Sequence, residues 1–350
     1  MKLLIVGNSY RKLHLEHLSH ELKKLNIESK VIVDSDFIEK TLSFKFFKYF
    51  EKKKKLDLVI KQFKPDLVLI DRISKIGNFL IKKNIPFIIL LRGNIWEELD
   101  WYKKLNQKCF FKKLRNRIHE DLIKKMFHNS LGIIVISEYL KNETSKRYPN
   151  KKIDLIYADG RNLSEWIPKK SFSFSQPCIG LIQGLNVWPK TKELETLGDV
   201  MKNLPYVNFY LAGDGEYSEK IIPKLIKYEN FTWLGNLEYP KKIIEFLSSI
   251  DIFLFLSGLE GLGQSIIESM IMEKPIIATN VGGISELISD GKTGYLVNIG
   301  DSQKITHYIE YILSNEKIKN DLIINAKLKS KNFSWHKIAH DFSIVLEKYR

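Results

Sequence analysis

The stretch SGLEGLGQSIIESMIMEKPIIATNVGGISELISDGKTGYLV, residues 257–297, decides the fold of this chain. It begins directly after one apolar run and contains another, Pro275–Ala278, beyond a segment with the pattern of a helix. Gly261 and Gly263 form a Gly-x-Gly turn where the first strand gives way to that helix. The order strand, helix, strand predicts parallel strands, because parallel neighbours need a crossover connection.

Glu260 and Glu268 lie eight positions apart on either side of this turn. Carboxylates accept hydrogen bonds from hydroxyl groups, and the first backbone N–H groups of a helix attract phosphate. Both kinds of group therefore surround one small volume. This pattern predicts a site for a ligand that carries hydroxyls and phosphates together, such as a sugar nucleotide.

The same alternation of apolar runs and helical stretches extends over the whole chain. Continuous apolar runs such as LVLI and FIILL predict strands that are covered on both faces, as in a parallel sheet. The first series of predicted strands is Lys2–Val6, Lys30–Val33, Asp66–Ile70, Pro86–Leu91, Gly132–Ile136 and Ile153–Ala158. The second series is Cys178–Ile182, Val207–Leu211, Phe231–Leu234, Ile252–Leu256, Pro275–Ala278 and Gly294–Val297.

Two series of strands predict two domains in this α/β chain, each a Rossmann-like, doubly wound parallel sheet. We expect one domain at residues 1–165 and a second domain at residues 178–330. The polar stretch 168–177 separates them, and a helix within residues 331–350 is expected to pack back toward the first domain. Ligands of such sheets bind beyond the carboxyl ends of the strands.

The charge of the chain is concentrated in its first half. Of the net +15, residues 1–160 contribute all, with 34 Lys and Arg against 19 Asp and Glu, whereas the second half has 22 of each. This asymmetry predicts an anionic partner for the first half, although a generally Lys-rich composition is the alternative. Cys109 and Cys178 do not form a disulfide framework, which fits a reducing compartment. With no signal peptide or membrane-spanning run, we expect a cytoplasmic protein, either free or peripheral on the inner face of the membrane.

Six ordered segments of the second half resemble the retaining family-4 glycosyltransferases, which belong to glycosyl transferases group 1 and have the GT-B fold of two domains facing across a cleft. The segments are IGLIQGLNVWPKTKEL (179–194), FYLAGDGEY (209–217), FTWLGNLEY (231–239), DIFLFLSGLEGLGQSIIESM (251–270), PIIATNVGGISELI (275–288) and DGKTGYLV (290–297). VISEYLKNE (135–143) and IYADGRN (156–162) add weaker support.

The resemblance implies a metal-independent, retaining transfer of a sugar from a UDP- or GDP-sugar to a lipid-linked or cell-envelope glycan, with no cofactor. It assigns acceptor binding to residues 1–165 and nucleotide-sugar binding to residues 178–330. It also assigns Glu260 to the hydroxyls of the donor sugar, Glu268 to the ribose and Lys190 to the leaving diphosphate. Its other implied donor contacts are Gly7, Asn8, Gly184, Gly235, Asn236, Gly261, Leu262, Gly263 and Gln264, with Gly282, Gly283 and Glu286 behind the donor.

Leu185 departs from the family pattern, which has an arginine there beside the lysine on the diphosphate. A leucine removes a bidentate partner for phosphate. Arg161 and Arg11 are candidates to replace it. The alternative is a relative that binds sugar nucleotides or a membrane and has lost turnover.

Several assignments have a purely structural alternative. Ser265-x-x-Glu268 is also the pattern of a helix capping box, and Lys190 taken alone is an ordinary surface lysine. Arg92 and Asn94 follow the fourth strand, where they meet an acceptor or phosphate, or else simply cap the strand end. Asp34-Ser35-Asp36 resembles a metal-binding Asp-x-Asp, but its place after a strand predicts a turn, and no metal site is expected.

Two basic, aromatic-rich stretches, residues 44–55 and 101–127, predict contact with an anionic membrane surface. The alternative is that their aromatic side chains pack onto the sheet while the lysines face water. Nucleic acid could use the same charge, but no nucleic-acid-binding motif is present, so none is expected as a partner.

Overall fold

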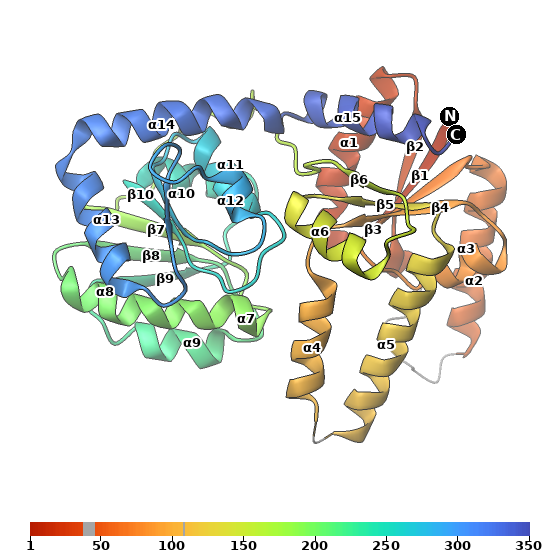
Figure 1. Cartoon of the computed structure of the whole chain (residues 1–350), viewed down its shortest axis with the longest axis horizontal. Coiled ribbons are helices and arrows are strands. Elements are labelled where there is room, and N and C mark those ends of the chain that lie inside the picture. The colour runs from red at the N-terminus through yellow and green to blue at the C-terminus, as the bar shows by residue number, and fades with distance from the viewer. Residues whose placement is uncertain (38–45, 108) are drawn as a thin grey trace. The chain divides into compact units, whose positions relative to one another are not determined.

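The computed structural model describes residues 1–37, 46–107 and 109–350, which form two compact units (Figure 1). Unit 1 comprises Met1–Gly160 and Trp335–Arg350, and unit 2 comprises Arg161–Ser334. Each unit contains one six-stranded sheet whose paired strands are all parallel. The expected α/β class is therefore confirmed.

The sheet of unit 1 has the strand order β2-β1-β3-β4-β5-β6. Its strands are β1 (Lys2–Gly7), β2 (Glu28–Val33), β3 (Leu67–Asp71), β4 (Phe87–Leu91), β5 (Gly132–Val135) and β6 (Ile153–Leu155). Its helices are α1 (Lys12–Lys24), α2 (Phe46–Phe63), α3 (Ile76–Lys82), α4 (Ile95–Leu105), α5 (Phe110–Asn129), α6 (Glu138–Arg147) and α15 (Trp335–Glu347), with short 3-10 turns at Ser9–Arg11 and Asp34–Asp36. The apolar runs at the centre of the sheet are completely buried, as helices on both faces require.

The sheet of unit 2 has the order β12-β11-β10-β7-β8-β9. Its strands are β7 (Cys178–Ile182), β8 (Asn208–Ala212), β9 (Phe231–Gly235), β10 (Ile252–Phe255), β11 (Ile276–Thr279) and β12 (Tyr295–Val297). Its helices are α7 (Trp188–Thr191), α8 (Leu197–Asn203), α9 (Ser218–Leu225), α10 (Lys241–Ser249), α11 (Gln264–Ile271), α12 (Ile284–Leu287), α13 (Ser302–Ser314) and α14 (Glu316–Ser330), with 3-10 turns at Lys192–Thr196 and Lys331–Phe333. The strand order reverses between β7 and β10, which is where open α/β sheets bind ligands.

The polar stretch 168–177 is not a free linker, because it packs on unit 2. The Phe174 ring stacks on Tyr210 at 3.9 Å between centroids, and the Lys169 backbone N–H donates to Ser248 Oγ at 2.8 Å. The Ser171 hydroxyl donates to Glu245 at 2.6 Å. The chain therefore passes from unit 1 to unit 2 after Gly160, before this stretch begins. It returns to unit 1 after Ser334.

The C-terminal segment is fastened to unit 1. Helix α15 packs against α1, and beyond it Lys348 Nζ and the Tyr349 hydroxyl donate to the two oxygens of Asp154 in β6, at 2.6 and 2.8 Å. Burial, together with Asp154, holds the pKa of Tyr349 above its usual value, so this hydroxyl remains a donor over the physiological range.

We expect Asp154→Ala to destabilise unit 1 by about 1–3 kcal/mol, because it removes both contacts and leaves the Tyr349 hydroxyl without its acceptor. For a unit of this size, thermal unfolding should shift down by roughly 2–4 °C per kcal/mol. The matched control is Asp341→Ala, whose partner Lys337 is half exposed on the same C-terminal segment. It should cost less than about 1 kcal/mol. Equal shifts for the two variants would contradict this account of the C-terminal anchor.

Candidate active site

The predicted site residues of unit 2 meet where β7 and β10 end. The loop after β10 is held by Ser257, whose backbone N–H donates to Thr279 Oγ1 at 3.0 Å and whose carbonyl accepts from the same hydroxyl at 2.7 Å. Leu259 and Leu262 are buried beneath the loop. Glu260 lies between them, and its carboxylate accepts a hydrogen bond from the Ser257 hydroxyl at 3.2 Å.

Lys190 and Glu260 form an ion pair of 3.0 Å, although they are seventy positions apart in the sequence. Lys190 belongs to α7, in the loop region after β7, and its carbonyl accepts from the Gln183 side chain at 2.9 Å. The two loops can approach because position 258 is glycine, since a Cβ there would lie 2.5 Å from the Pro189 carbonyl oxygen. The lysine and carboxylate predicted for the donor are thus side by side.

Helix α11 begins at this point with a glycine N-cap. Gly263 has φ +97°, a left-handed conformation that favours glycine, and it supplies no side-chain cap. The N-terminal N–H groups of a helix and its positive dipole end suit a phosphate. Ser265 is the second residue of the helix and not its N-cap, so the capping-box interpretation of Ser265 and Glu268 is wrong.

Glu268 is buried in α11 and pairs with a buried arginine. Arg161 donates to Glu268 Oε1 from Nε at 3.1 Å and from Nη2 at 2.7 Å, and the two side chains are 2% and 7% exposed. Arg161 also lies over the Trp166 ring, at 5.9 Å from its centroid. This pair orients Glu268 and gives Arg161 a structural partner. Their roles toward ribose and phosphate stay predictions.

Leu185 is fully buried in the apolar core of unit 2, where Leu194 and Ile221 belong to the same cluster. Its backbone N–H donates to the Asp214 carbonyl at 3.0 Å, and its carbonyl accepts from the Tyr217 N–H at 2.9 Å. The side chain at this position therefore packs inward. The spacing in the sequence did not indicate this direction.

The glycine-rich ends of β8 and β9 complete the same edge of the sheet. The Gly213 N–H donates to the Gly235 carbonyl at 2.7 Å, and the Trp233 indole N–H donates to the Gly213 carbonyl at 2.8 Å. Gly235 has φ +66° and Asn236 beside it is exposed. Gly184 is exposed directly after β7. These positions present backbone at the edge where a base or phosphate was predicted.

In unit 1, the predicted residues all have local structural roles. Gly7 lies where a Cβ would come within 2.2 Å of the Leu15 side chain, and Asn8 caps the turn that follows by accepting from the Arg11 N–H at 3.0 Å. Asn94 caps α4 and donates to the Tyr139 hydroxyl at 2.7 Å.

Arg92 and Arg11 belong to a buried ion-pair network at the carboxyl end of the unit 1 sheet. Arg92 donates from Nε to Asp71 at 2.5 Å and from Nη1 to Asp159 at 2.6 Å, and Arg11 donates to Asp159 at 2.8 Å. The sequence analysis missed both acids. Asp71 could have been found as the polar end of an apolar strand, and Asp159 as the acid of the YADGRN turn.

Within residues 1–37, 46–107 and 109–350, no cluster of three or more His, Cys, Asp or Glu side chains is arranged to hold a metal ion. The Asp34-Ser35-Asp36 segment forms the short 3-10 turn expected of it.

Comparison with known proteins decides the family. Residues 185–329 match the family described as glycosyl transferases group 1. An uncharacterised glycosyltransferase of Methanocaldococcus jannaschii is 30% identical over 268 residues, which cover 76% of this chain and 70% of that protein. The chain belongs to the group 1 glycosyltransferases.

Solved structures confirm the GT-B fold class of this group 1 glycosyltransferase. Sucrose-phosphate synthase of Thermosynechococcus elongatus superimposes with a TM-score of 0.78 at 17% identity, over 100% of this chain and 99% of that one. HepE of Anabaena, solved in complex with UDP-glucose, gives a TM-score of 0.71 at 17% identity, over 99% of this chain and 100% of that one.

The buried pair predicts a strong, non-additive effect on stability. Arg161→Met or Glu268→Gln alone should destabilise unit 2 by about 3–5 kcal/mol, because each leaves a buried charge without its partner. The double variant should lose less than the sum of the two. Lys224 and Glu195 form a matched exposed pair in the same unit, and the corresponding changes there should cost under about 1 kcal/mol. Thermal unfolding of all six variants checks this, and additive losses at 161 and 268 would refute it.

Proposed function

We propose that this group 1 glycosyltransferase is a metal-independent, retaining enzyme of family 4 that transfers a hexose from a UDP- or GDP-sugar. The observation that carries the proposal is the 3.0 Å pair of Lys190 and Glu260 beside the N-terminus of α11, at the point where the strand order reverses. One cation and one helix N-terminus suit a diphosphate, and the carboxylate beside them suits sugar hydroxyls.

In this proposal Lys190 acts mainly in the transition state. As the bond between C1 of the sugar and the phosphate oxygen breaks, its electron pair stays with the nucleoside diphosphate, and negative charge grows on that oxygen. Lys190 and the N-terminus of α11 stabilise this charge in a fixed geometry, which costs no reorganisation during the reaction. Glu260 then orients the sugar by accepting hydrogen bonds from its hydroxyls.

Retention of configuration follows from attack on the same face of the sugar. The acceptor hydroxyl forms the new bond to C1 while its proton passes to the departing phosphate oxygen, so no protein base is consumed. Glu260 is already ion-paired with Lys190 and accepts a hydrogen bond from Ser257, which suits an orienting group better than a nucleophile. A nucleoside-diphosphate donor is further supported by HepE, whose structure contains UDP-glucose.

The acceptor in this proposal is a lipid-linked or cell-envelope glycan that binds unit 1, with Arg92 and Asn94 near it. The support is the positive charge of residues 1–160. No helix in the described ranges has the length and apolarity needed to cross a bilayer. We propose a cytoplasmic location with peripheral attachment to the inner face of the membrane, which the basic stretches would provide.

A relative that binds sugar nucleotides without turnover is the second candidate. It is favoured by Leu185, which is buried in the core and supplies no cation to the diphosphate. The two candidates differ in turnover and agree in donor binding, so separate measurements of each distinguish them.

For donor binding, we expect UDP- or GDP-sugars to raise the unfolding temperature, because a ligand of the folded state stabilises it. At a concentration of about 100 Kd the gain is roughly 2.7 kcal/mol. A thermal-shift panel of UDP-, GDP- and ADP-sugars, each run with and without EDTA, is the measurement. No shift with any UDP- or GDP-sugar, or a shift abolished by EDTA, would contradict the proposed donor site.

For turnover, Glu260→Gln should lower donor hydrolysis and transfer by about 10²–10³-fold, because it removes the carboxylate from the sugar and from Lys190. The control is Glu195→Gln, an exposed carboxylate of the same unit, which should keep the wild-type rate. Rates unchanged in Glu260→Gln would refute the site. Donor binding with no hydrolysis or transfer in the wild type would instead establish the non-catalytic candidate.

A further inference from the structure

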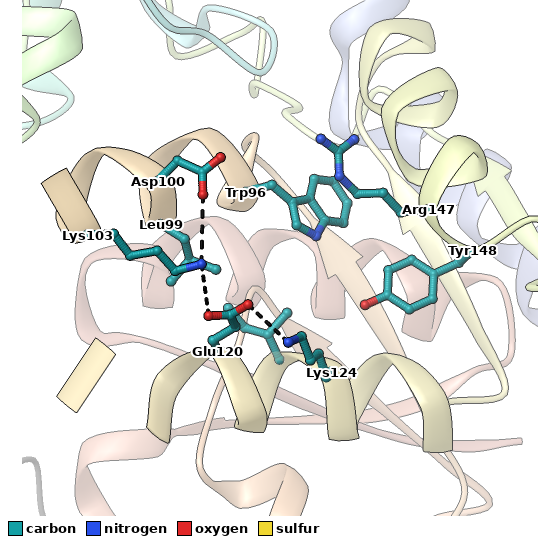
Figure 2. Close-up of a pocket in the computed structure, with 9 residues that line it drawn as sticks. Trp96, Leu99, Asp100, Lys103, Glu120, Lys124, Arg147 and Tyr148 are labelled. Carbon is teal, nitrogen blue, oxygen red and sulfur yellow. Dashed lines mark ion pairs between the residues drawn. The ribbon is translucent and has the colours of Figure 1, made fainter. Parts of the chain in front are cut away.

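Helices α4 and α5 form a hairpin that extends away from the sheet of unit 1 (Figure 1). An ion pair and a hydrogen bond link its two helices. Lys103 of α4 contacts Glu120 of α5 at 2.9 Å, and Lys124 contacts the same carboxylate at 3.0 Å (Figure 2). The Asn116 side chain donates to the Tyr102 carbonyl at 3.1 Å, which adds a second link between the helices.

The base of the hairpin is also anchored. The Arg147 guanidinium of α6 lies over the Trp96 ring of α4 at 4.6 Å (Figure 2), and Trp96 packs edge-on against Phe127 of α5. Such contacts combine cation–π attraction with burial of aromatic surface. The hairpin is therefore held as a defined element of unit 1.

The free end of the hairpin, in contrast, leaves large apolar side chains in solvent. They are Leu105 (55% exposed), Phe110 (73%), Phe111 (79%), Leu114 (46%) and Ile118 (54%). Phe110, Leu114 and Ile118 are spaced by four residues and so form one stripe along α5. Phe110 and Phe111 therefore do not pack onto the sheet, whereas Phe127 at the other end of the same stretch is buried. The packed arrangement holds for only part of residues 101–127. The aromatic side chains within residues 44–50, from the other basic stretch, lie outside the described residues.

The same end carries one sign of charge. Residues 105–118 contain no Asp or Glu. Their basic residues that the structure describes are Lys112, Lys113, Arg115 and Arg117. Apolar side chains surrounded by Lys and Arg match the boundary between acyl chains and anionic headgroups. An acidic protein or a nucleic acid would use the charge but leave the aliphatic side chains in water.

We propose that the end of the α4–α5 hairpin, residues 105–107 and 109–118, is a docking site for a bilayer that contains anionic lipid. Phe110 and Phe111 enter the acyl boundary, and the basic side chains lie at the headgroups. From Phe110 to Ile118 the helix rises about 12 Å, which is enough to cross the headgroup layer. This inference rests on the proposed function for the benefit of docking, since docking brings unit 1, the proposed acceptor-binding unit, to the surface where a lipid-linked acceptor would lie.

The chain provides its own reporter for a test. Cys109 precedes Phe110 and is partly exposed, whereas Cys178 is fully buried. Burial raises the pKa of the Cys178 thiol to about 11, so a thiol reagent at neutral pH labels Cys109. An environment-sensitive dye on Cys109 should shift to the blue with vesicles of phosphatidylcholine and phosphatidylglycerol, and not with phosphatidylcholine alone. The same dye at Leu328→Cys in a Cys109→Ser background should not shift.

Vesicle flotation of variants completes the test. Phe110→Ser/Phe111→Ser should lower binding to anionic vesicles about tenfold or more, because each lost ring removes buried apolar area. Lys112→Glu/Lys113→Glu should lower binding to anionic vesicles by a similar factor. The binding that remains should depend less on salt concentration. The control Ile324→Ser/Leu328→Ser removes an exposed apolar pair (64% and 63%) from α14 and should bind as the wild type does.

Absence of wild-type binding, binding indifferent to phosphatidylglycerol, or a Phe110→Ser/Phe111→Ser variant that still binds fully would each overturn the proposal. Transfer to a soluble acceptor is measured separately without vesicles. Failure of membrane docking is thereby distinguished from failure of the proposed transferase activity.

Discussion

The close approach of the loops after β7 and β10 builds the candidate site of unit 2. These strands are neighbours at the centre of the sheet, and Gly258 allows the second loop to lie against the Pro189 carbonyl. Lys190 and Glu260 meet at 3.0 Å as a consequence. Gly263 then starts α11 with its N-terminus at the same edge. Groups that attract phosphate and a group that accepts from hydroxyls are thus positioned by backbone packing, which suits catalysis by preorganised charge.

Much of this fold could be predicted from the sequence, because the signals are local. Short apolar runs predicted twelve strands, and all twelve are present within a few residues of their predicted bounds. The turn around Gly261 and Gly263 was likewise visible from its glycines and from the helix that follows. The position of Glu260 just beyond a strand was also visible in the sequence, because the carboxyl ends of parallel strands lie at one edge of the sheet. Its role toward the sugar stays a prediction.

The misses concern contacts that spacing does not encode. The distance of five positions from Lys190 identified position 185. It did not show that this side chain points into the core, where it belongs to the same cluster as Leu194 and Ile221. Arg161 and Arg92 were considered as candidates for phosphate or acceptor, yet each has a buried carboxylate partner. Those partners, Glu268, Asp71 and Asp159, lie 21 to 107 positions away, so the pairs exist only once the chain has folded.

The central claim is that Lys190 serves the diphosphate while Glu260 serves the sugar. Calorimetric titration with UDP and GDP, which carry no sugar, separates the two roles. Lys190→Met should weaken binding of the preferred nucleotide about tenfold or more, since it removes a cation from a phosphate. Glu260→Gln should leave that affinity within about a factor of two, because Gln keeps the shape of the site and no sugar is present. Equal losses in both variants, or an unchanged affinity in Lys190→Met, would contradict the account.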